Sequence, residues 1–195
     1  MVINVAINGF GRIGRMVFRE AFKDPKINIV AINDLTDPHT LAYLLKFDSV
    51  HGKFEKKVRS GKDHLHVGTQ KIRVLKEKDP ALLPWKHFKI DVVVESTGFF
   101  RTKELASKHL TAGAKKVLIS ANYKGDQQIK TLIQGVNLQI YDKKKDHIIS
   151  KGSCTTTCLS PIAKVLDDTL GIETGFIVTT HGVTSSQKIV DAPHK

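Results

Sequence analysis

The stretch KGSCTTTCLSP, residues 151–161, contains both cysteines of the chain, Cys154 and Cys158. The pattern from SCTTTC onward predicts a helix whose first turn holds Cys154. A helix N-terminus stabilises a thiolate through its dipole and its free backbone N–H groups. Cys154 is therefore the candidate nucleophile. Cys158 lies one turn further along the helix, where a small apolar thiol is expected to pack in the core.

Metal and disulfide roles for the two cysteines are less favoured. Two ligands four residues apart on a helix can support a metal pair, but no second pair stands nearby, so we expect no metal site. A disulfide at that spacing within a regular helix is geometrically strained. The two cysteines, and an N-terminus without signal-peptide character, favour a reducing, cytoplasmic compartment.

A second candidate site is a glycine-rich turn. Gly9, Gly11 and Gly14 form a GxGxxG pattern after the run VINVAIN, and Asp34 follows at the distance of about 20 residues typical of dinucleotide-binding folds. The first glycine permits the tight turn, the second lets backbone approach a pyrophosphate, and the third lets the helix pack against the strand. Asp34 is expected to accept hydrogen bonds from ribose hydroxyls and to repel a 2′-phosphate, which favours NAD over NADP.

The elements that must position these sites follow from the hydrophobic pattern. A strand, a helix and a second strand are expected within the first 34 residues, and Asp37 with Pro38 predicts the start of another helix. Short strands joined at Gly61 and Gly68 are expected over 54–75. Buried strands in IDVVVE and KVLIS flank a helix in LASKHLTAG, which closes on Gly113. This alternation predicts an α/β fold with a Rossmann-type, doubly wound parallel sheet.

Composition narrows the function classes. The chain has 195 residues, 41% of them hydrophobic, and no apolar run near the ~20 residues of a membrane-spanning helix, so no membrane role is expected. The net charge of +12 raises nucleic acid as a partner. The lysines are scattered and not interleaved with aromatic residues, which favours a solvated surface and leaves nucleic acid as a secondary possibility. A positive field would also draw small phosphorylated ligands toward a cleft.

Seven stretches in order resemble the phosphorylating glyceraldehyde-3-phosphate dehydrogenase family of glycolysis: INGFGRIGR, INDLTDP, LLKFDSVHGKF, VVVESTGFF, AGAKKVLIS, SCTTTC and QKIVDAPHK. The resemblance implies NAD as cofactor, glyceraldehyde 3-phosphate and inorganic phosphate as substrates, and a homotetramer at full length. Family members continue beyond residue 195. We therefore expect residues 1–150 to form the NAD-binding Rossmann domain and 151–195 to begin an α+β catalytic domain that is truncated here.

The resemblance also implies roles for individual residues. A lone histidine at the end of a strand, here GFIVTTH, is most often solvated or bonded to backbone. By resemblance, however, His181 is the general base that takes the proton of Cys154, an arrangement suited to covalent catalysis on an aldehyde. The implied substrate contacts are Ser153, Thr155 and Thr184. The implied cofactor contacts are Gly9, Gly11, Arg12, Ile13, Gly14, Asp34, Lys78 and Ser120.

Two alternatives stay open. One is erythrose-4-phosphate dehydrogenase, a related oxidoreductase whose substrate choice rests partly on residues beyond this chain. The other is a catalytically impaired NAD-binding or RNA-binding fragment, motivated by the truncation and the positive charge. An enzyme makes NADH from an aldehyde, whereas a binding module only retains cofactor or nucleic acid, the latter with steep salt dependence.

Overall fold

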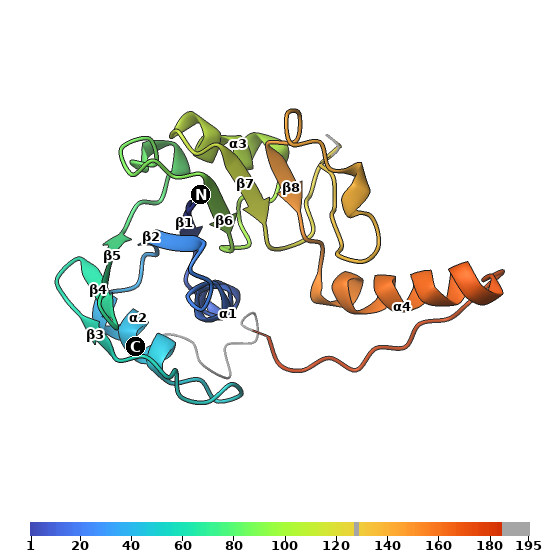
Figure 1. Cartoon of the computed structure of the whole chain (residues 1–195), viewed down its shortest axis with the longest axis horizontal. Helices are drawn as coiled ribbons and strands as arrows, with labels where there is room; N and C mark the ends of the chain where they lie inside the picture. Colours follow the sequence, from blue (N-terminus) through green and yellow to red (C-terminus); the bar gives the residue numbers. More distant parts are fainter. Residues whose placement is uncertain (127–128, 185–195) are drawn as a thin grey trace.

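The computed structural model describes residues 1–126 and 129–184, and its centre is one eight-stranded sheet (Figure 1). The QKIVDAPHK stretch lies outside the described residues. The strands are β1 (Ile3–Asn8), β2 (Ile27–Asn33), β3 (Val58–Ser60), β4 (His64–Val67), β5 (Gln70–Leu75), β6 (Val92–Glu95), β7 (Lys116–Ile119) and β8 (Ile148–Ser150). The helices are α1 (Arg12–Ala21), α2 (Pro38–Lys46), α3 (Lys103–Thr111) and α4 (Cys154–Leu170), with short 3-10 turns η1 (Pro80–Leu82) and η2 (Leu138–Ile140).

The strand order, β3-β4-β5-β2-β1-β6-β7-β8, confirms the predicted α/β fold. Strands β5, β2, β1, β6, β7 and β8 run parallel, and β3 and β4 add antiparallel hairpins at one edge. β2, the next strand along the chain, pairs with one edge of β1, and the later strand β6 pairs with its other edge. The direction in which strands are added to the sheet therefore reverses at β1. In an open α/β sheet, the crevice at such a reversal, outside the carboxyl ends of the strands, is the usual ligand site.

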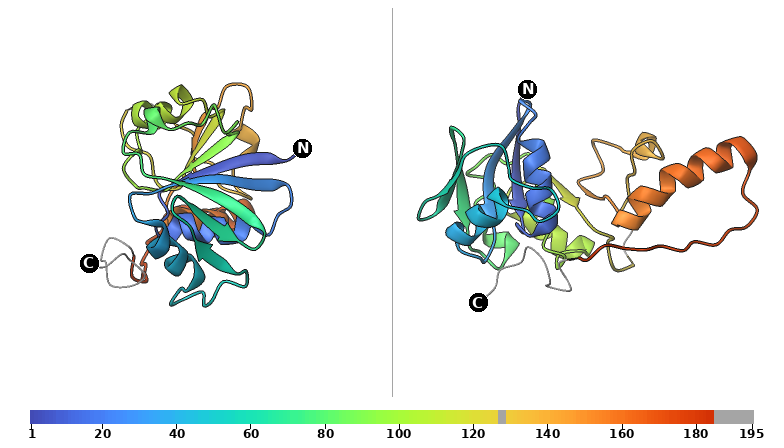
Figure 2. Two further views of the ribbon diagram at one scale, coloured as in Figure 1. Left: turned by 90° about the vertical axis from the view of Figure 1, so that its left-hand side faces the viewer. Right: turned by 90° about the horizontal axis from the view of Figure 1, so that it is seen from below.

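Both faces of the central sheet are covered, which explains the continuous apolar runs of its strands. On β1, Val5 and Ile7 pack in a core with Phe18 of α1, whereas Ala6 between them packs on the other face in a cluster with Trp85. Figure 2 shows the strands fanning with the usual twist between α1 and α2 on one side and α3 on the other. The crevice at the carboxyl ends of β1, β2 and β6 is therefore bordered by strands that are packed on both faces.

The helix and turn signals in the sequence are confirmed where local chemistry decides the backbone. Asp37 caps α2, its carboxylate accepting from the N–H of Thr40 at 2.9 Å, and Pro38 occupies the first turn. Thr102 caps α3 in the same way toward Leu105. The strands β3, β4 and β5 are joined at the expected glycines.

The C-terminal part differs from the sequence analysis in one strand that was missed and one that was wrongly expected. β8, a short strand paired with β7, was not predicted. The strand expected in GFIVTTH is not formed, because a strand needs a hydrogen-bonding neighbour and none of the described residues provides one. Instead α4 projects away from the sheet, and residues 171–184 run back beside it (Figures 1 and 2). In the described chain no residue of α4 is buried.

Candidate functional site

The glycine-rich turn has the geometry that its sequence predicts. Gly9 has a φ of +88°, and a Cβ there would lie 2.6 Å from the backbone nitrogen of Thr97. A Cβ on Gly14 would lie 2.1 Å from the carbonyl oxygen of Gly9, so α1 can approach β1 only without a side chain here. A Cβ on Gly11 would meet nothing within 4 Å. Gly11 thus leaves backbone open to a ligand, while Gly9 and Gly14 allow the turn itself.

A cleft of about 480 Å³ opens beside this turn, at the carboxyl ends of β1, β2 and β6. Of the residues expected to bind a cofactor, the cleft is lined by Gly9, Gly11, Arg12, Ile13, Asp34 and Lys78. Gly14 does not line the cleft, and its Cα faces the carbonyl oxygen of Gly9 instead. Ser120 does not line the cleft; it follows β7, where its N–H donates to the carbonyl of Glu95 at 3.0 Å. The structure therefore brings six of these eight residues together at one cleft.

The carboxylate of Asp34 fastens the end of β2 to the glycine-rich turn. Its Oδ2 accepts a hydrogen bond from the N–H of Phe10 at 2.7 Å, and its Oδ1 accepts one from Thr36 at 2.9 Å. An ionised carboxylate has about four acceptor sites, so two backbone bonds leave capacity for a ligand hydroxyl. Asp34 is thus both an element of the turn and a negative group on the cleft wall.

Sequence reasoning missed several residues that line the cleft. Asn8 and Asn33 end β1 and β2, and Thr97 follows β6; each sits at the carboxyl end of a parallel strand, which is the signal that could have found them. Apolar side chains also border the cleft, among them Leu35 and Phe99, which are 58% and 80% exposed. A polar floor with exposed apolar side chains suits a ligand that joins planar rings to a charged linker.

The sheet register links this cleft to the cysteine. Asn8 is paired with Glu95, Glu95 with Ile119, and Ile119 with Ser150, so the carboxyl ends of β1, β6, β7 and β8 lie in one row. Three strand spacings of ~4.8 Å give roughly 14 Å from the first to the last. Because α4 begins shortly after Ser150, an extended ligand that lies along this edge points toward Cys154.

Cys154 is the first residue of α4, as predicted. Ser153 caps the helix, its Oγ accepting from the N–H of Thr156 at 3.0 Å. The Sγ of Cys154 lies 2.9 Å from Nε2 of His181. The other ring nitrogen, Nδ1, lies 2.7 Å from the carbonyl oxygen of Gly182, which can only accept a hydrogen bond. His181 therefore carries a proton on Nδ1 and presents Nε2 to the thiol, the tautomer that a general base requires.

The pair also shifts its own protonation equilibria. The hydrogen bond from His181 is the largest cause that lowers the pKa of Cys154, and the backbone N–H of Thr155 adds to it. The carbonyl of Gly182 raises the pKa of His181, with Cys154 as the next cause. Both shifts favour a thiolate beside an imidazolium. Because both side chains are solvent-exposed, water screens part of this interaction.

These shifts predict a pH dependence of thiol reactivity. In a Cys158→Ser background, where Cys154 is the remaining thiol, the midpoint for alkylation by iodoacetamide should lie below that of an ordinary cysteine. His181→Gln removes the imidazolium, so the midpoint should rise and the rate at neutral pH should fall several-fold. Rates measured from pH 5 to 10 for both proteins test this. Superimposable profiles would show that His181 does not influence the thiol.

The remaining predicted substrate residues differ in their placement. Thr155 lines a pocket of about 410 Å³ between α4 and residues 177–182, together with Cys154 and His181. Ser153 does not line it, and its hydroxyl serves as the helix cap. Thr184, the last described residue, also lies outside the lining. In the described chain, this pocket and the cleft share no lining residue.

The prediction that Cys158 packs in the core is wrong. Cys158 is exposed and lines the same pocket as Cys154. The reason is that only the extended segment beside α4 contacts this face, so the face is not enclosed. Both cysteines are free thiols. In the parts of the chain that the structure describes, no group of three His, Cys, Asp or Glu side chains is placed to hold a metal ion.

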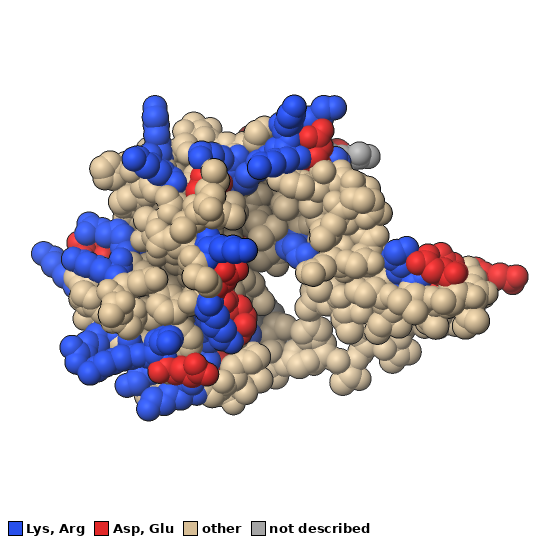
Figure 3. All heavy atoms as spheres, viewed as in Figure 1, with Lys and Arg blue, Asp and Glu red and all other residues tan. Residues whose placement is uncertain are grey.

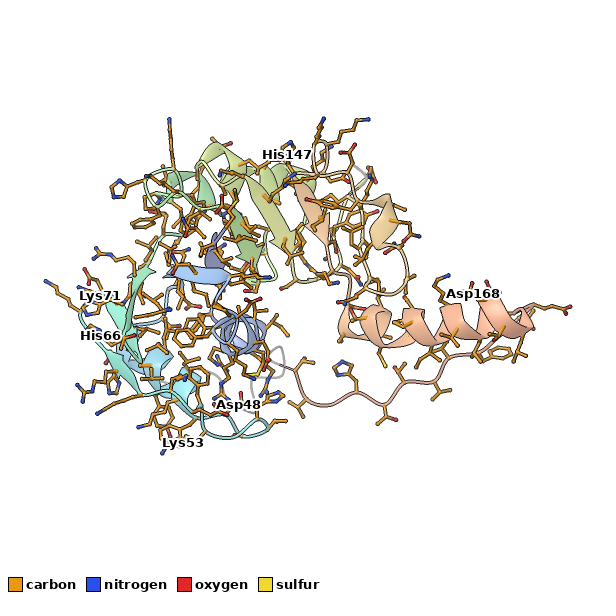
Figure 4. All side chains as sticks on the ribbon, viewed as in Figure 1. Asp48, Lys53, His66, Lys71, His147 and Asp168 are labelled. Carbon is orange, nitrogen blue, oxygen red and sulfur yellow. The ribbon has the colours of Figure 1, made fainter. Side chains whose placement is uncertain are left out.

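Basic side chains are spread over the surface. In the face shown in Figure 3, Lys and Arg side chains lie over many elements of the sheet region with acidic groups between them. The register puts Arg59, His66 and Lys71 in one row across β3, β4 and β5. His66 and Lys71 lie on the left-hand side of the molecule in Figure 4. Among the described residues, no helix is both long and apolar enough to cross a bilayer.

Two protein-family profiles match this chain. Residues 3–103 match the profile described as glyceraldehyde 3-phosphate dehydrogenase, NAD binding domain. Residues 153–195 match the profile described as glyceraldehyde 3-phosphate dehydrogenase, C-terminal domain. The first match covers the glycine-rich turn and Asp34, and the second begins at the N-terminus of α4.

Curated relatives align along the entire chain. The glyceraldehyde-3-phosphate dehydrogenase of Geobacillus stearothermophilus is 52% identical over 195 residues, which is 100% of this chain and 58% of that protein. The protein of the same name from Mycoplasma pneumoniae is 54% identical over 192 residues, 98% of this chain and 56% of that protein. The chain therefore spans somewhat more than half the length of these relatives.

Proposed function

The chain belongs to the glyceraldehyde 3-phosphate dehydrogenase family, and we propose that it contributes the NAD cleft and the reactive cysteine to a phosphorylating oxidation of glyceraldehyde 3-phosphate to 1,3-bisphosphoglycerate. The observation that carries this proposal is the 2.9 Å contact between Cys154 and His181 at a helix N-terminus. We further propose that residues 1–150 form the NAD-binding unit and that 151–195 begin the catalytic domain.

The cleft suits NAD. Gly11 leaves backbone N–H groups at the start of α1 open to a pyrophosphate, and Arg12 lies next to them with a permanent positive charge. Asp34 has free acceptor capacity for ribose hydroxyls. Leu35 and Phe99 offer apolar surface to a planar ring. When bound, NAD supplies the two-electron acceptor that oxidation of an aldehyde requires.

The chemistry of the protein's own residues follows from the Cys154–His181 pair. Nε2 of His181 takes the S–H proton of Cys154, and the resulting thiolate attacks the aldehyde carbon. The backbone N–H of Cys154, at the start of α4, would help to hold the new oxyanion. Loss of a hydride from this carbon, for which bound NAD would be the acceptor, leaves a thioester of Cys154. Phosphate attacks that thioester, the C–S bond breaks, and the thiolate is regenerated beside His181. Thr155, and Thr184 by resemblance, would contact the phosphate groups.

Steady-state NADH formation by the chain tests this proposal. Turnover should require both glyceraldehyde 3-phosphate and inorganic phosphate, and erythrose 4-phosphate should be the poorer aldehyde. Preference for erythrose 4-phosphate would assign the chain to that related activity instead. NAD binding without any NADH formation would identify a binding module. Retention of RNA with steep salt dependence and no NAD binding would favour the nucleic-acid alternative.

The charge of Asp34 predicts the cofactor preference. Asp34→Asn keeps one acceptor oxygen but removes the charge that repels a 2′-phosphate. The ratio of NAD to NADP affinity should fall roughly tenfold, which corresponds to about 1.4 kcal/mol. Calorimetric titration with both nucleotides measures the ratio. Since Asn is isosteric with Asp, an unchanged ratio would place the 2′-hydroxyl away from this side chain.

Location and assembly are also proposals. We propose a cytoplasmic protein, because two free cysteines are typical of a reducing compartment. We propose a homotetramer for the full-length protein from the family resemblance alone. Analytical ultracentrifugation of a full-length product would show the tetramer directly.

A further inference from the structure

A buried polar network lies beneath the NAD cleft, and its centre is His109 of α3. His109 is fully buried and is not among the residues that line this cleft. Its Nδ1 lies 3.0 Å from Nε1 of Trp85, the single tryptophan of the chain, which is also fully buried. An indole N–H can only donate, so Nδ1 of His109 must accept. The imidazole is therefore neutral, with its proton on Nε2.

That proton is aimed at Glu95, the last residue of β6. Nε2 of His109 lies 3.0 Å from Oε2 of Glu95, whose side chain is 1% exposed. The same oxygen accepts from Nδ2 of Asn8. The other oxygen accepts from the N–H of Thr97 at 2.8 Å and from the Thr97 hydroxyl. Donors surround both carboxylate oxygens, which is how a buried carboxylate is stabilised.

The network continues into the floor of the cleft. Because Nδ2 of Asn8 faces Glu95, its Oδ1 faces Asn33, which donates to it at 2.7 Å. Oδ1 of Asn33 in turn accepts from the N–H of Glu77 at 2.8 Å. Nδ2 of Asn33 also donates to the carbonyl of Glu77 at 2.8 Å. Glu95 thus orients the amide of Asn8, and the backbone of Glu77 orients the amide of Asn33 that bonds to it. Asn8, Asn33, Glu77 and Thr97 all line the cleft, so this orientation decides which donors and acceptors a ligand meets.

The same residues support the glycine-rich turn. The backbone nitrogen of Thr97 is the atom that a Cβ on Gly9 would approach to 2.6 Å, and Oγ of Ser96 donates to the carbonyl of Gly9 at 2.7 Å. A shift of Thr97 would therefore push directly on the turn. Within the described chain, His109 also makes an edge contact with Phe100, a residue that lines the cleft, at a ring distance of 6.3 Å.

We propose that His109 is a positioning residue for the nucleotide cleft: without touching the ligand, it holds Glu95 and thereby fixes the side chains of Asn8 and Thr97. Trp85 has the supporting role of keeping the proton on Nε2. Without a donor at this position, Glu95 is left partly unsatisfied in a buried site, and the amide of Asn8 is held less firmly by the carboxylate that orients it. This inference rests on the proposed binding of NAD.

The test compares NAD affinities by calorimetry across matched variants of the chain. His109→Leu fills a similar volume but removes both hydrogen bonds, and NAD should bind about tenfold more weakly. His109→Gln supplies a donor for Glu95 and an acceptor for Trp85, and should restore affinity to within about threefold of wild type. Ile90→Ala is the control: it deletes a fully buried side chain from the Trp85 cluster without removing a side-chain hydrogen bond, and affinity should stay unchanged.

Trp85→Phe keeps the inference testable if His109→Leu does not fold. It preserves aromatic packing but releases Nδ1 of His109, so NAD affinity should fall about threefold. Wild-type NAD affinity in the folded His109→Leu and Trp85→Phe variants would overturn this inference and leave the proposed function standing. A loss of NAD affinity in Ile90→Ala as large as that in His109→Leu would do the same. A wild-type chain that binds no NAD would overturn the proposed function and this inference together.

Discussion

Replacing Cys154 by serine should reduce NADH formation by roughly 10⁴-fold or more, because the hydroxyl is a far weaker nucleophile and cannot form the thioester. NAD affinity should be unchanged, since Cys154 does not line the nucleotide cleft. The measurement pairs steady-state turnover with a calorimetric titration of NAD on the same preparation. The expected result is thus a loss of turnover without a loss of NAD affinity.

Cys158→Ser is the matched control for this variant. Cys158 lies one turn along the same helix, is also exposed, and lines the same pocket. The sulfur that lies 2.9 Å from Nε2 of His181 is, however, that of Cys154. Its replacement should change turnover by less than about twofold, as is usual for an isosteric change away from the reacting atoms. Dehydrogenase activity that survives in Cys154→Ser but not in Cys158→Ser would reverse the assignment of the nucleophile.

The second large effect is expected at the glycine-rich turn. Gly14→Ala places a methyl group 2.1 Å from the carbonyl oxygen of Gly9, which is backbone and cannot rotate away. The free energy of unfolding should fall by about 2 kcal/mol or more, as for overpacking in a rigid core. NAD affinity should fall as well, because the displaced turn no longer presents its N–H groups. Urea denaturation and NAD titration measure the two effects.

Gly11→Ala separates stability from binding. A Cβ at Gly11 meets nothing within 4 Å, and its φ of −70° suits alanine, so unfolding should change by less than about 1 kcal/mol. NAD affinity should nevertheless fall about tenfold or more, because the methyl group occupies space that the pyrophosphate needs. Full NAD affinity in Gly11→Ala would mean that the pyrophosphate lies elsewhere.

Local chemistry made much of the fold predictable. Asp37 followed by Pro38, and three glycines at fixed spacing after an apolar run, specify backbone conformation within a few residues. The glycine-rich turn, α1, α2 and the hairpins β3 to β5 therefore lie where the sequence predicts. For the same reason Cys154 is found at the start of its helix, since Ser153 supplies the cap.

Long-range contacts could not be predicted in this way. Glu95 and Asn8 are 87 residues apart, and His109 and Asn8 are 101 apart, so only the assembled sheet brings them together. The predicted strand before His181 failed for a related reason: an apolar run forms a strand only beside a neighbour. The core position predicted for Cys158 failed in the same way, because a thiol on a helix is buried only where another element covers that face.

The central claim is that Cys154 carries the oxidised substrate as a thioester, and a burst measurement tests it most directly. The chain is mixed with NAD and glyceraldehyde 3-phosphate without inorganic phosphate, and NADH is followed by its absorbance. The account predicts a burst approaching one NADH per chain that then stalls, resumes when phosphate is added, and is absent in Cys154→Ser. A chain that binds NAD but shows no burst, or a burst that persists in Cys154→Ser, would contradict it.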